Sequence, residues 1–276
     1  MNEESNKIEI ETARNPSLSQ SETDAAYCRA ALYSALAIGF QAPTAETLAR
    51  LLTAESRSSL IGAANLLYPS GTPDLISVIE AFPNSNDECL TAISSRHREL
   101  FGHTVRGPIP PYETEYGNEA LFQLPHELGD LMGFYNAFGL ILKPGLHERA
   151  DHISCECEFL MFLALKESYA LEHDDREMLT EVEKAEQLFL RDHLGRFLPT
   201  FESKLRRHGD AGFYGLLGQL CLRLVTAECR RLQLPTGAAN LDLRPADDDR
   251  VPMACGSGAE CGAMPGACVP EEADSV

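Results

Sequence analysis

Apolar residues recur every three or four positions through most of the chain, which is the spacing of one face of an α-helix. In residues 24–40, DAAYCRAALYSALAIGF, the side chains of Tyr27, Ala31 and Ala35 share such a face, and Pro43 ends the segment. The same pattern predicts further helices over residues 44–67 with one break, 73–82, 85–101, 125–138, 151–172, 174–193, 198–208 and 212–232. The predicted secondary structure is therefore helical throughout.

The predicted helix over residues 151–172 is apolar on nearly all sides. Its apolar residues form two stripes, one of Ile153, Cys157, Leu160, Met161 and Ala164 and another of Phe159, Phe162 and Leu163. A helix that is hydrophobic all round is buried among other elements. We therefore expect this helix to lie at the centre of the fold.

The composition supports a fold without sheets. The chain has 38 Leu against 7 Val and 10 Ile. This ratio disfavours strands, because β-branched residues favour pleated surfaces whereas Leu loses little rotamer freedom in a helix. The sequence predicts an all-α fold, with one globular domain of about ten helices around the central hydrophobic helix.

Both ends of the chain differ in composition from the helical region. Residues 1–23 are rich in Glu, Ser, Asn and Thr, and residues 235–276 hold 2 basic and 8 acidic side chains and no aromatic residue. Such segments cannot bury enough apolar surface to offset the entropy of ordering. We expect a disordered N-terminal tail over 1–23, a helical domain over 24–234, and a flexible, acidic, Gly- and Cys-rich tail over 235–276.

The net charge favours cationic partners over nucleic acid. The 276 residues include 23 Lys and Arg against 42 Asp and Glu, a formal net charge of −19. Such a field repels phosphate backbones and attracts cationic peptides or proteins, so we expect no nucleic acid as a partner. The longest apolar runs, such as residues 159–165, are far shorter than the roughly 20 residues that cross a bilayer, and the polar start is unlike a signal peptide. We expect a cytoplasmic protein without stable membrane insertion.

A proline-rich turn divides the helical chain near its middle. Leu100 and Phe101 precede it, and residues 107–116 read GPIPPYETEY. Proline fixes φ at about −65°, which stiffens the turn, and its tyrosines offer amphipathic contact surface. Rigidity reduces the entropy that is lost when a peptide docks. The turn is either a peptide-binding surface or only a connector between helices.

A second motif, ERADHISCECEF over residues 148–159, opens the central helix. Asp151 is predicted to be the N-cap, where its charge suits the positive end of the helix dipole. The next residue, His152, is either held protonated by carboxylates or presents a neutral imidazole to a ligand. His152, Cys155 and Glu156 share one helix face, but the chain has no H-E-x-x-H or paired C-x-x-C motif, which argues against a structural zinc.

The nine cysteines are an odd number, which in a cytoplasmic protein indicates reduced thiols. Cys255, Cys261 and Cys268 lie among glycines in the C-terminal tail and offer three thiolates to a metal ion or an iron–sulfur cluster. Their spacing matches none of the standard ligand patterns, so a redox-sensitive tail is the simpler interpretation. A metal or iron–sulfur accessory protein is the alternative function.

The sequence carries no common enzymatic signature. It has no G-x-x-x-x-G-K-[ST] phosphate loop, no G-x-G-x-x-G motif and no G-x-S-x-G elbow. A hydrolase with Asp151 and His152 as an acid–base pair would lack an identifiable nucleophile or activated water. The sequence therefore predicts a protein without catalytic activity.

Leu100-Phe101 and three longer motifs occur in a defined order along the chain. Leu100-Phe101 is followed by PPYETEY over residues 110–116, DHISCECEF over residues 151–159 and HLGRFLPTF over residues 193–201. Together they resemble the motifs of the TorD/DmsD-type redox-enzyme maturation chaperones, and the resemblance covers about Ala25 to Leu232. The chain differs from that family in two positions, because Phe197 stands where the family often has Trp and Thr114 replaces its usual Ser.

The resemblance implies an all-helical chaperone that binds the twin-arginine signal peptide and the apo form of the catalytic subunit of a molybdopterin-dependent oxidoreductase. Such a chaperone assists cofactor insertion and assembly before export, acts as a monomer or homodimer, and has no turnover and no cofactor of its own. By position, the resemblance assigns client binding to Leu100, Phe101, Pro110, Pro111, Tyr112, Glu113, Tyr116, Asp151, His152, Glu156 and Glu158.

The chemistry of a twin-arginine leader agrees with this assignment. Such a leader combines two guanidinium groups with an apolar stretch, so its receptor needs carboxylates beside an apolar groove. The chain offers both if the proline-rich turn and the start of the central helix lie side by side. We expect that arrangement, with a weak and releasable interface of about 1,000 Å².

Overall fold

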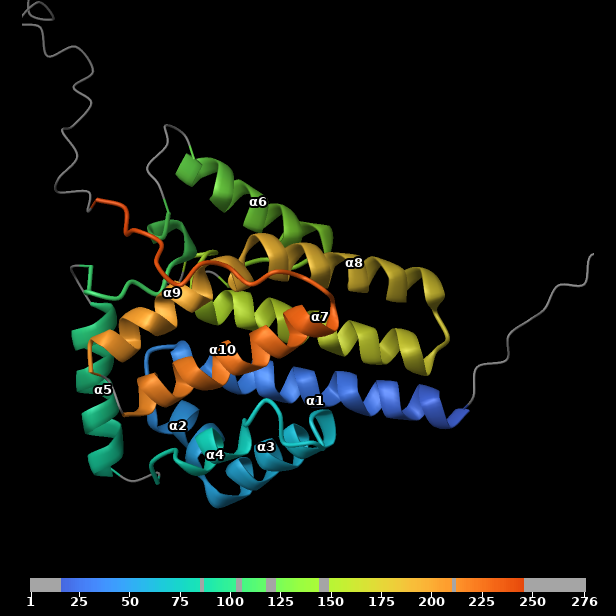
Figure 1. The fold of residues 1–276 in the computed structure, drawn as a ribbon, viewed down its shortest axis with the longest axis horizontal. Helices are drawn as coiled ribbons and strands as arrows, with labels where there is room; N and C mark the ends of the chain where they lie inside the picture. Colours follow the sequence, from blue (N-terminus) through green and yellow to red (C-terminus); the bar gives the residue numbers. More distant parts are fainter. Residues whose placement is uncertain are drawn as a thin grey trace, which may run out of the picture. The chain divides into compact units, whose positions relative to one another are not determined.

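The computed structural model describes residues 16–84, 87–102, 106–117, 123–143, 149–209 and 212–245. Within these residues the chain forms ten α-helices and one 3₁₀ helix, with isolated β-bridges but no strand, so the all-α prediction is confirmed (Figure 1). The helices are α1 (Pro16–Phe40), α2 (Ala45–Leu52), α3 (Ala54–Leu67), α4 (Ile76–Glu80), α5 (Asp87–Phe101), η1 (Glu113–Glu115), α6 (Gln123–Ala137), α7 (Ile153–Glu172), α8 (Arg176–Asp192), α9 (Leu194–Arg207) and α10 (Phe213–Arg231).

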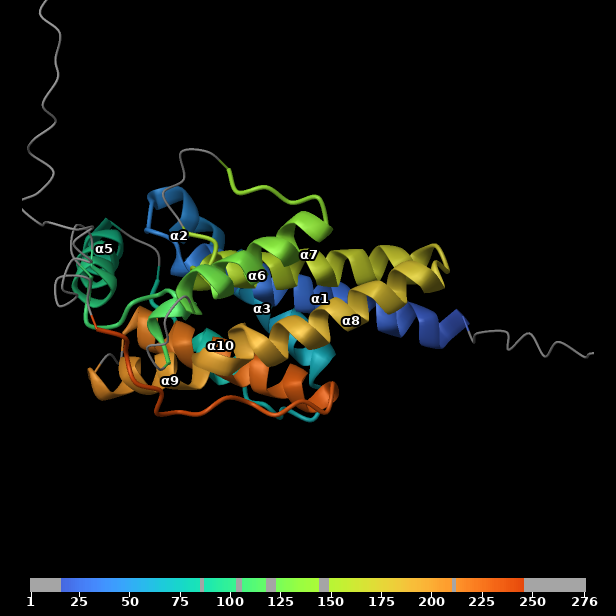
Figure 2. The same cartoon turned by 90° about the horizontal axis from the view of Figure 1, so that it is seen from above.

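Helix α7 lies at the centre of the helical domain, as its apolar surface predicts, and pairs along its length with α1 (Figures 1 and 2). The hydroxyl of Tyr27, near the middle of α1, donates to Glu172 at the end of α7 at 3.0 Å. Gln41, just after α1, lines the same cavity as Ser154 in the first turn of α7. The two helices are therefore antiparallel neighbours.

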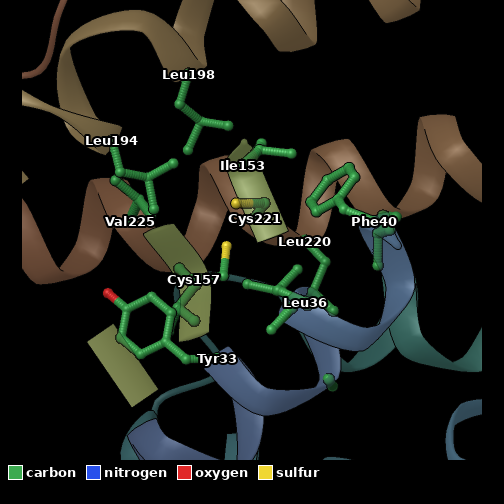
Figure 3. Packing of buried hydrophobic residues seen from close by; sticks show 14 of the residues in the cluster. Tyr33, Leu36, Phe40, Ile153, Cys157, Leu194, Leu198, Leu220, Cys221 and Val225 are labelled. Carbon is green, nitrogen blue, oxygen red and sulfur yellow. The ribbon is translucent and has the colours of Figure 1, made fainter. Parts of the chain in front are cut away.

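One hydrophobic core joins α1, α7, α9 and α10. Figure 3 shows side chains from these helices meeting in the interior, with the sulfur atoms of Cys157 and Cys221 facing each other. The labelled residues of this core are Tyr33, Leu36, Phe40, Ile153, Cys157, Leu194, Leu198, Leu220, Cys221 and Val225. All are buried from solvent, which removes their apolar surface from water and supplies the main favourable term in folding.

A buried ion network also ties α1 to α7 and α10. Both oxygens of the Glu167 carboxylate accept from the guanidinium of Arg29 at 2.6 Å, and Arg29 lies 3.8 Å from Glu228. Glu228 also pairs with Arg231, whose guanidinium reaches Glu186 on α8 at 2.7 Å. Because each buried charge has a charged partner, the network can exist away from water.

The helical domain extends further than predicted at both ends. Helix α1 begins at Pro16 rather than at residue 24, so residues 16–23 are helical and not part of an N-terminal tail. At the other end, one compact unit runs to Arg244 rather than to residue 234. The rest of the predicted C-terminal tail, after residue 245, lies outside the described residues.

Residues 235–244 are ordered because they form specific contacts with α9. Pro199, inside this helix, has no N–H, which leaves the carbonyl of Gly195 without its helical partner. That carbonyl accepts from the N–H of Gly237 at 2.9 Å, and the hydroxyl of Thr200 accepts from the N–H of Leu241 at 2.9 Å. We call residues 235–244 the C-terminal strap.

Substitution of Gly237 by Ala should detach this strap. A Cβ atom there would lie 1.9 Å from the backbone oxygen of Arg196, so either the strap or α9 must move. We expect a loss of about 1–3 kcal/mol in the free energy of unfolding, as for other overpacked sites. Chemical denaturation followed by circular dichroism measures this loss. The matched control is Gly62→Ala, which meets nothing within 4 Å and should leave stability unchanged or raised by up to about 1 kcal/mol. Equal effects of the two substitutions would contradict the proposed contact.

Candidate functional site

The proline-rich turn and the start of α7 lie side by side, as expected. The N–H of Glu113 donates to the carbonyl of Asp151 at 2.8 Å, and the N–H of Ile153 donates to the carbonyl of Pro111 at 2.8 Å. Tyr112 and His152 form an antiparallel bridge between these two bonds. The two motifs are therefore joined through their backbones.

Glu113 joins the turn to α9. Its side chain is 1% exposed. One carboxylate oxygen lies 3.0 Å from Nδ1 of His193, and the other accepts from the guanidinium of Arg196 at 2.7 Å. A buried carboxylate is stable only when it is paired in this way. Glu113 is therefore a structural anchor and is not accessible to a ligand in this conformation.

Asp151 has a similar structural role. Its carboxylate accepts from the hydroxyl of Thr114 at 2.7 Å and from the guanidinium of Arg149 at 2.7 Å and 3.0 Å. The prediction that Asp151 caps α7 is wrong, because the cap is His152, whose Nδ1 accepts from the N–H of Ser154 at 3.1 Å. Asp151 is instead used to bind the turn.

His152 is neutral. Burial, together with the nearby charges of His97 and Arg149, lowers its pKa to about 3. Its ring packs against the edge of Tyr112, with ring centroids 5.2 Å apart. Of the two protonation states that the sequence left open, the structure selects the neutral imidazole, used as a helix cap.

The apolar residues of the motifs are also internal. Tyr116 is fully buried, its hydroxyl donates to the carbonyl of Pro110 at 2.8 Å, and its ring packs on Phe197, where the family resemblance expects Trp. Leu100 and Phe101 are buried in the core. Pro110 and Pro111 are buried as well. The expectation that these side chains line an open surface does not fit this conformation.

The two glutamates of the α7 motif have opposite environments. Glu156 is fully buried, and within the described part of the chain neither of its carboxylate oxygens has a hydrogen-bond partner. Burial, together with the nearby charge of Glu113, raises its pKa well above the ordinary value, so it is held as the neutral acid. Glu158 is exposed to solvent. It is the predicted site carboxylate that a ligand can reach.

Glu158 lies at an apolar cavity of about 270 Å³, which we call the α7 pocket. The lining comes from the first half of α7, from Tyr135 of α6 and the segment after this helix, and from Gln41. The lining residues are Gln41, Tyr135, Leu140, Ile141, Leu142, Lys143, Ser154, Cys155, Glu158, Phe159, Met161 and Phe162. Sequence reasoning missed residues 140–142, although the apolar run LIL directly after the helix-ending Gly139 was a signal for an exposed apolar segment.

The alternative function, a metal or iron–sulfur accessory protein, gains no support from the described residues. No group of three or more His, Cys, Asp or Glu side chains in these ranges is arranged to hold a metal ion. The candidate ligands Cys255, Cys261 and Cys268 lie outside the described residues. None of the described helices combines the length and the hydropathy needed to span a membrane.

Comparison with known proteins identifies the family. The family described as nitrate reductase delta subunit matches residues 67–203, about half of the chain. A TorD chaperone of Photobacterium profundum is 27% identical over 176 residues, which is 60% of this chain and 80% of the relative. A TorD chaperone of Vibrio cholerae is 25% identical over 189 residues, 67% of this chain and 83% of the relative. A perchlorate reductase assembly chaperone of Dechloromonas aromatica is 26% identical over 216 residues, 76% of this chain and 92% of the relative. The chain belongs to the TorD family of maturation chaperones.

Membership of the TorD family confirms the resemblance carried by the three motifs. It also agrees with the prediction that the protein is not an enzyme, because this family consists of assembly chaperones. The family match over residues 67–203 includes the turn, the first half of α7 and most of the residues that line the α7 pocket. The framework built on Glu113 and Asp151 therefore belongs to the TorD-family part of the chain.

Removing the charge of Glu113 should destabilise this TorD-family fold. Glu113→Gln leaves Arg196 and His193 without a buried anion, and we expect a loss of about 3 kcal/mol in the free energy of unfolding. The control Asp192→Asn changes a carboxylate whose side chain is 43% exposed and which pairs with the exposed Arg191. That substitution should cost about 1 kcal/mol or less. Chemical denaturation of both variants tests the difference, and a similar loss in both would show that Glu113 is not an anchor.

Glu156 should make stability fall as the pH rises. Its raised pKa means that the folded state keeps a proton that the unfolded state loses above pH 4.5, the ordinary value for this carboxyl. Stability linked to Glu156 is therefore complete below that pH and decreases above it. In Glu156→Gln this dependence disappears, so the variant should gain stability relative to the natural protein between pH 5 and pH 8. Denaturation midpoints measured across this range test the prediction, and parallel pH profiles would contradict it.

Proposed function

We propose that this protein is an assembly chaperone for the molybdopterin-dependent catalytic subunit of an oxidoreductase. It binds the twin-arginine leader of this client in the cytoplasm and holds the apo form until the cofactor is inserted. The names of the relatives support a chaperone of this class, since they are TorD chaperones and an assembly chaperone of perchlorate reductase.

The α7 pocket is the observation that carries the proposal. It is an apolar cavity open to solvent, next to the motif residues of the family, with an exposed carboxylate at Glu158. Burying one Leu or Phe side chain contributes about 1.5–3 kcal/mol, so a pocket that takes two such side chains supports a reversible, releasable complex. An apolar segment next to an arginine is the ligand that this combination fits.

Apolar contact should supply more of the affinity than charge does. Among the described lining residues Glu158 is the only carboxylate, and Lys143 is the only cation. An exposed ion pair contributes about 0–1 kcal/mol, so one Glu158–Arg contact adds little to equilibrium binding. The net charge of −19 instead favours the encounter with a cationic leader. This differs from the expected receptor with several accessible carboxylates, because Glu113, Asp151 and Glu156 are buried.

A synthetic peptide with two adjacent arginines followed by a stretch of leucines and alanines tests the proposal. Fluorescence anisotropy should give saturable binding, and Phe162→Ser should weaken it by about tenfold, because the lost apolar contact is worth about 1.4 kcal/mol. The matched control is Tyr169→Ser on the same helix, since Tyr169 is 48% exposed and does not line the pocket. It should change the affinity by less than about twofold.

The peptide provides the second arm of this experiment. Replacing its leucines by serines should abolish binding, whereas replacing both arginines by glutamines should weaken binding by about fivefold or less. Equal affinities of the natural protein and Phe162→Ser for the unmodified peptide would contradict the assignment of the leader to the α7 pocket.

A further inference from the structure

One wall of the α7 pocket has the side-chain alternation of a β-strand. Leu140 and Leu142 are half-buried and pack against the core, whereas Ile141 is 85% exposed and Lys143 is exposed. Side chains that alternate between inside and outside with a period of two are typical of extended backbone. In Figure 2 the chain leaves the end of α6 as an extended segment without helical turns.

Beyond Leu140, the backbone of this segment is unpaired within the described residues. The N–H of Leu140 donates to the carbonyl of Tyr135 at 2.8 Å. For Ile141, Leu142 and Lys143, no backbone hydrogen bond to another described residue is formed. Extended backbone with free N–H and C=O groups beside an apolar cavity is the arrangement that binds peptides by strand addition.

We propose that the client segment binds in the α7 pocket as an extended strand that pairs with the backbone of residues 141–143. Its alternate side chains enter the pocket and contact Met161 and Phe162 on α7, and the side chains between them face solvent. This inference rests on the proposed function, because the occupant is the apolar, arginine-bearing leader of the client.

With Glu158 as the one carboxylate among the described lining residues, the pocket fits an extended ligand better than a helical one. Adjacent residues of a strand point in opposite directions, so only one of two neighbouring arginines can face Glu158 while the other faces solvent. An arginine and an apolar residue two positions later point the same way, and both can reach the pocket. A receptor for such a strand needs one carboxylate beside apolar side chains, and Glu158 with Phe162 and Met161 provides this.

The test uses the full chain and the synthetic peptide with two arginines and an apolar stretch. Methylating one backbone nitrogen of the peptide at a time removes one N–H donor without changing a side chain. Methylation of a backbone nitrogen that faces residues 141–143 should weaken binding by at least about threefold. Methylation of the nitrogens between them, which face away from this segment, should weaken it by less than about twofold. The control Leu165→Thr changes an exposed side chain of α7 that does not line the pocket and should leave the affinity within about twofold.

Hydrogen exchange measured by NMR gives a second readout on the protein itself. Bound peptide should slow exchange either at the amides of Ile141 and Lys143 or at the amide of Leu142, because neighbouring amides of a strand point to opposite edges. If the peptide binds but methylation weakens it at every interior position and these amides exchange unchanged, the strand is overturned and the proposed function stands. If the unmodified peptide does not bind, both are overturned.

Discussion

The buried carboxylate of Glu113 is the contact on which the surroundings of the α7 pocket depend. One of its oxygens lies beside His193 and the other accepts from Arg196, so the turn cannot leave α9 without leaving buried polar groups unpaired. The backbone of Glu113 also bonds to the residue before His152, the cap of α7. A single residue thus joins the turn to α7 through its backbone and to α9 through its side chain.

The buried motif residues hold the fold, whereas the accessible pocket residues can contact a ligand. The hydroxyl of Thr114 donates to Asp151, and the carboxylate of Glu113 accepts from Arg196, so these motif side chains form contacts inside the molecule that hold the backbone. Glu158 and Phe162, which lie one helical turn apart on α7, line the pocket. Substitutions of the buried motif residues should therefore reduce both stability and client binding, whereas substitutions of the pocket residues should reduce client binding alone.

The helices could be predicted from the sequence because their apolar faces have a local period, and the capping change from Asp151 to His152 shifts the start of α7 by little. The burial of Glu113 could not be predicted, because its partners His193 and Arg196 lie about eighty residues away in the chain. A polar motif is predicted to lie on the surface unless the buried partners of its side chains are known. The C-terminal strap was missed for a related reason, since its order depends on the carbonyl that Pro199 leaves free in α9.

The side-chain methyl groups around the pocket report most directly on whether it receives the client. Methyl NMR spectra of the full chain should change at Leu140, Ile141, Leu142 and Met161 when the twin-arginine peptide is added. The exposed Leu66 on α3 and Leu165 further along α7 should keep their positions. Shifts confined to Leu66 or Leu165, with the pocket methyl groups unchanged under saturating peptide, would contradict the assignment of client binding to the α7 pocket.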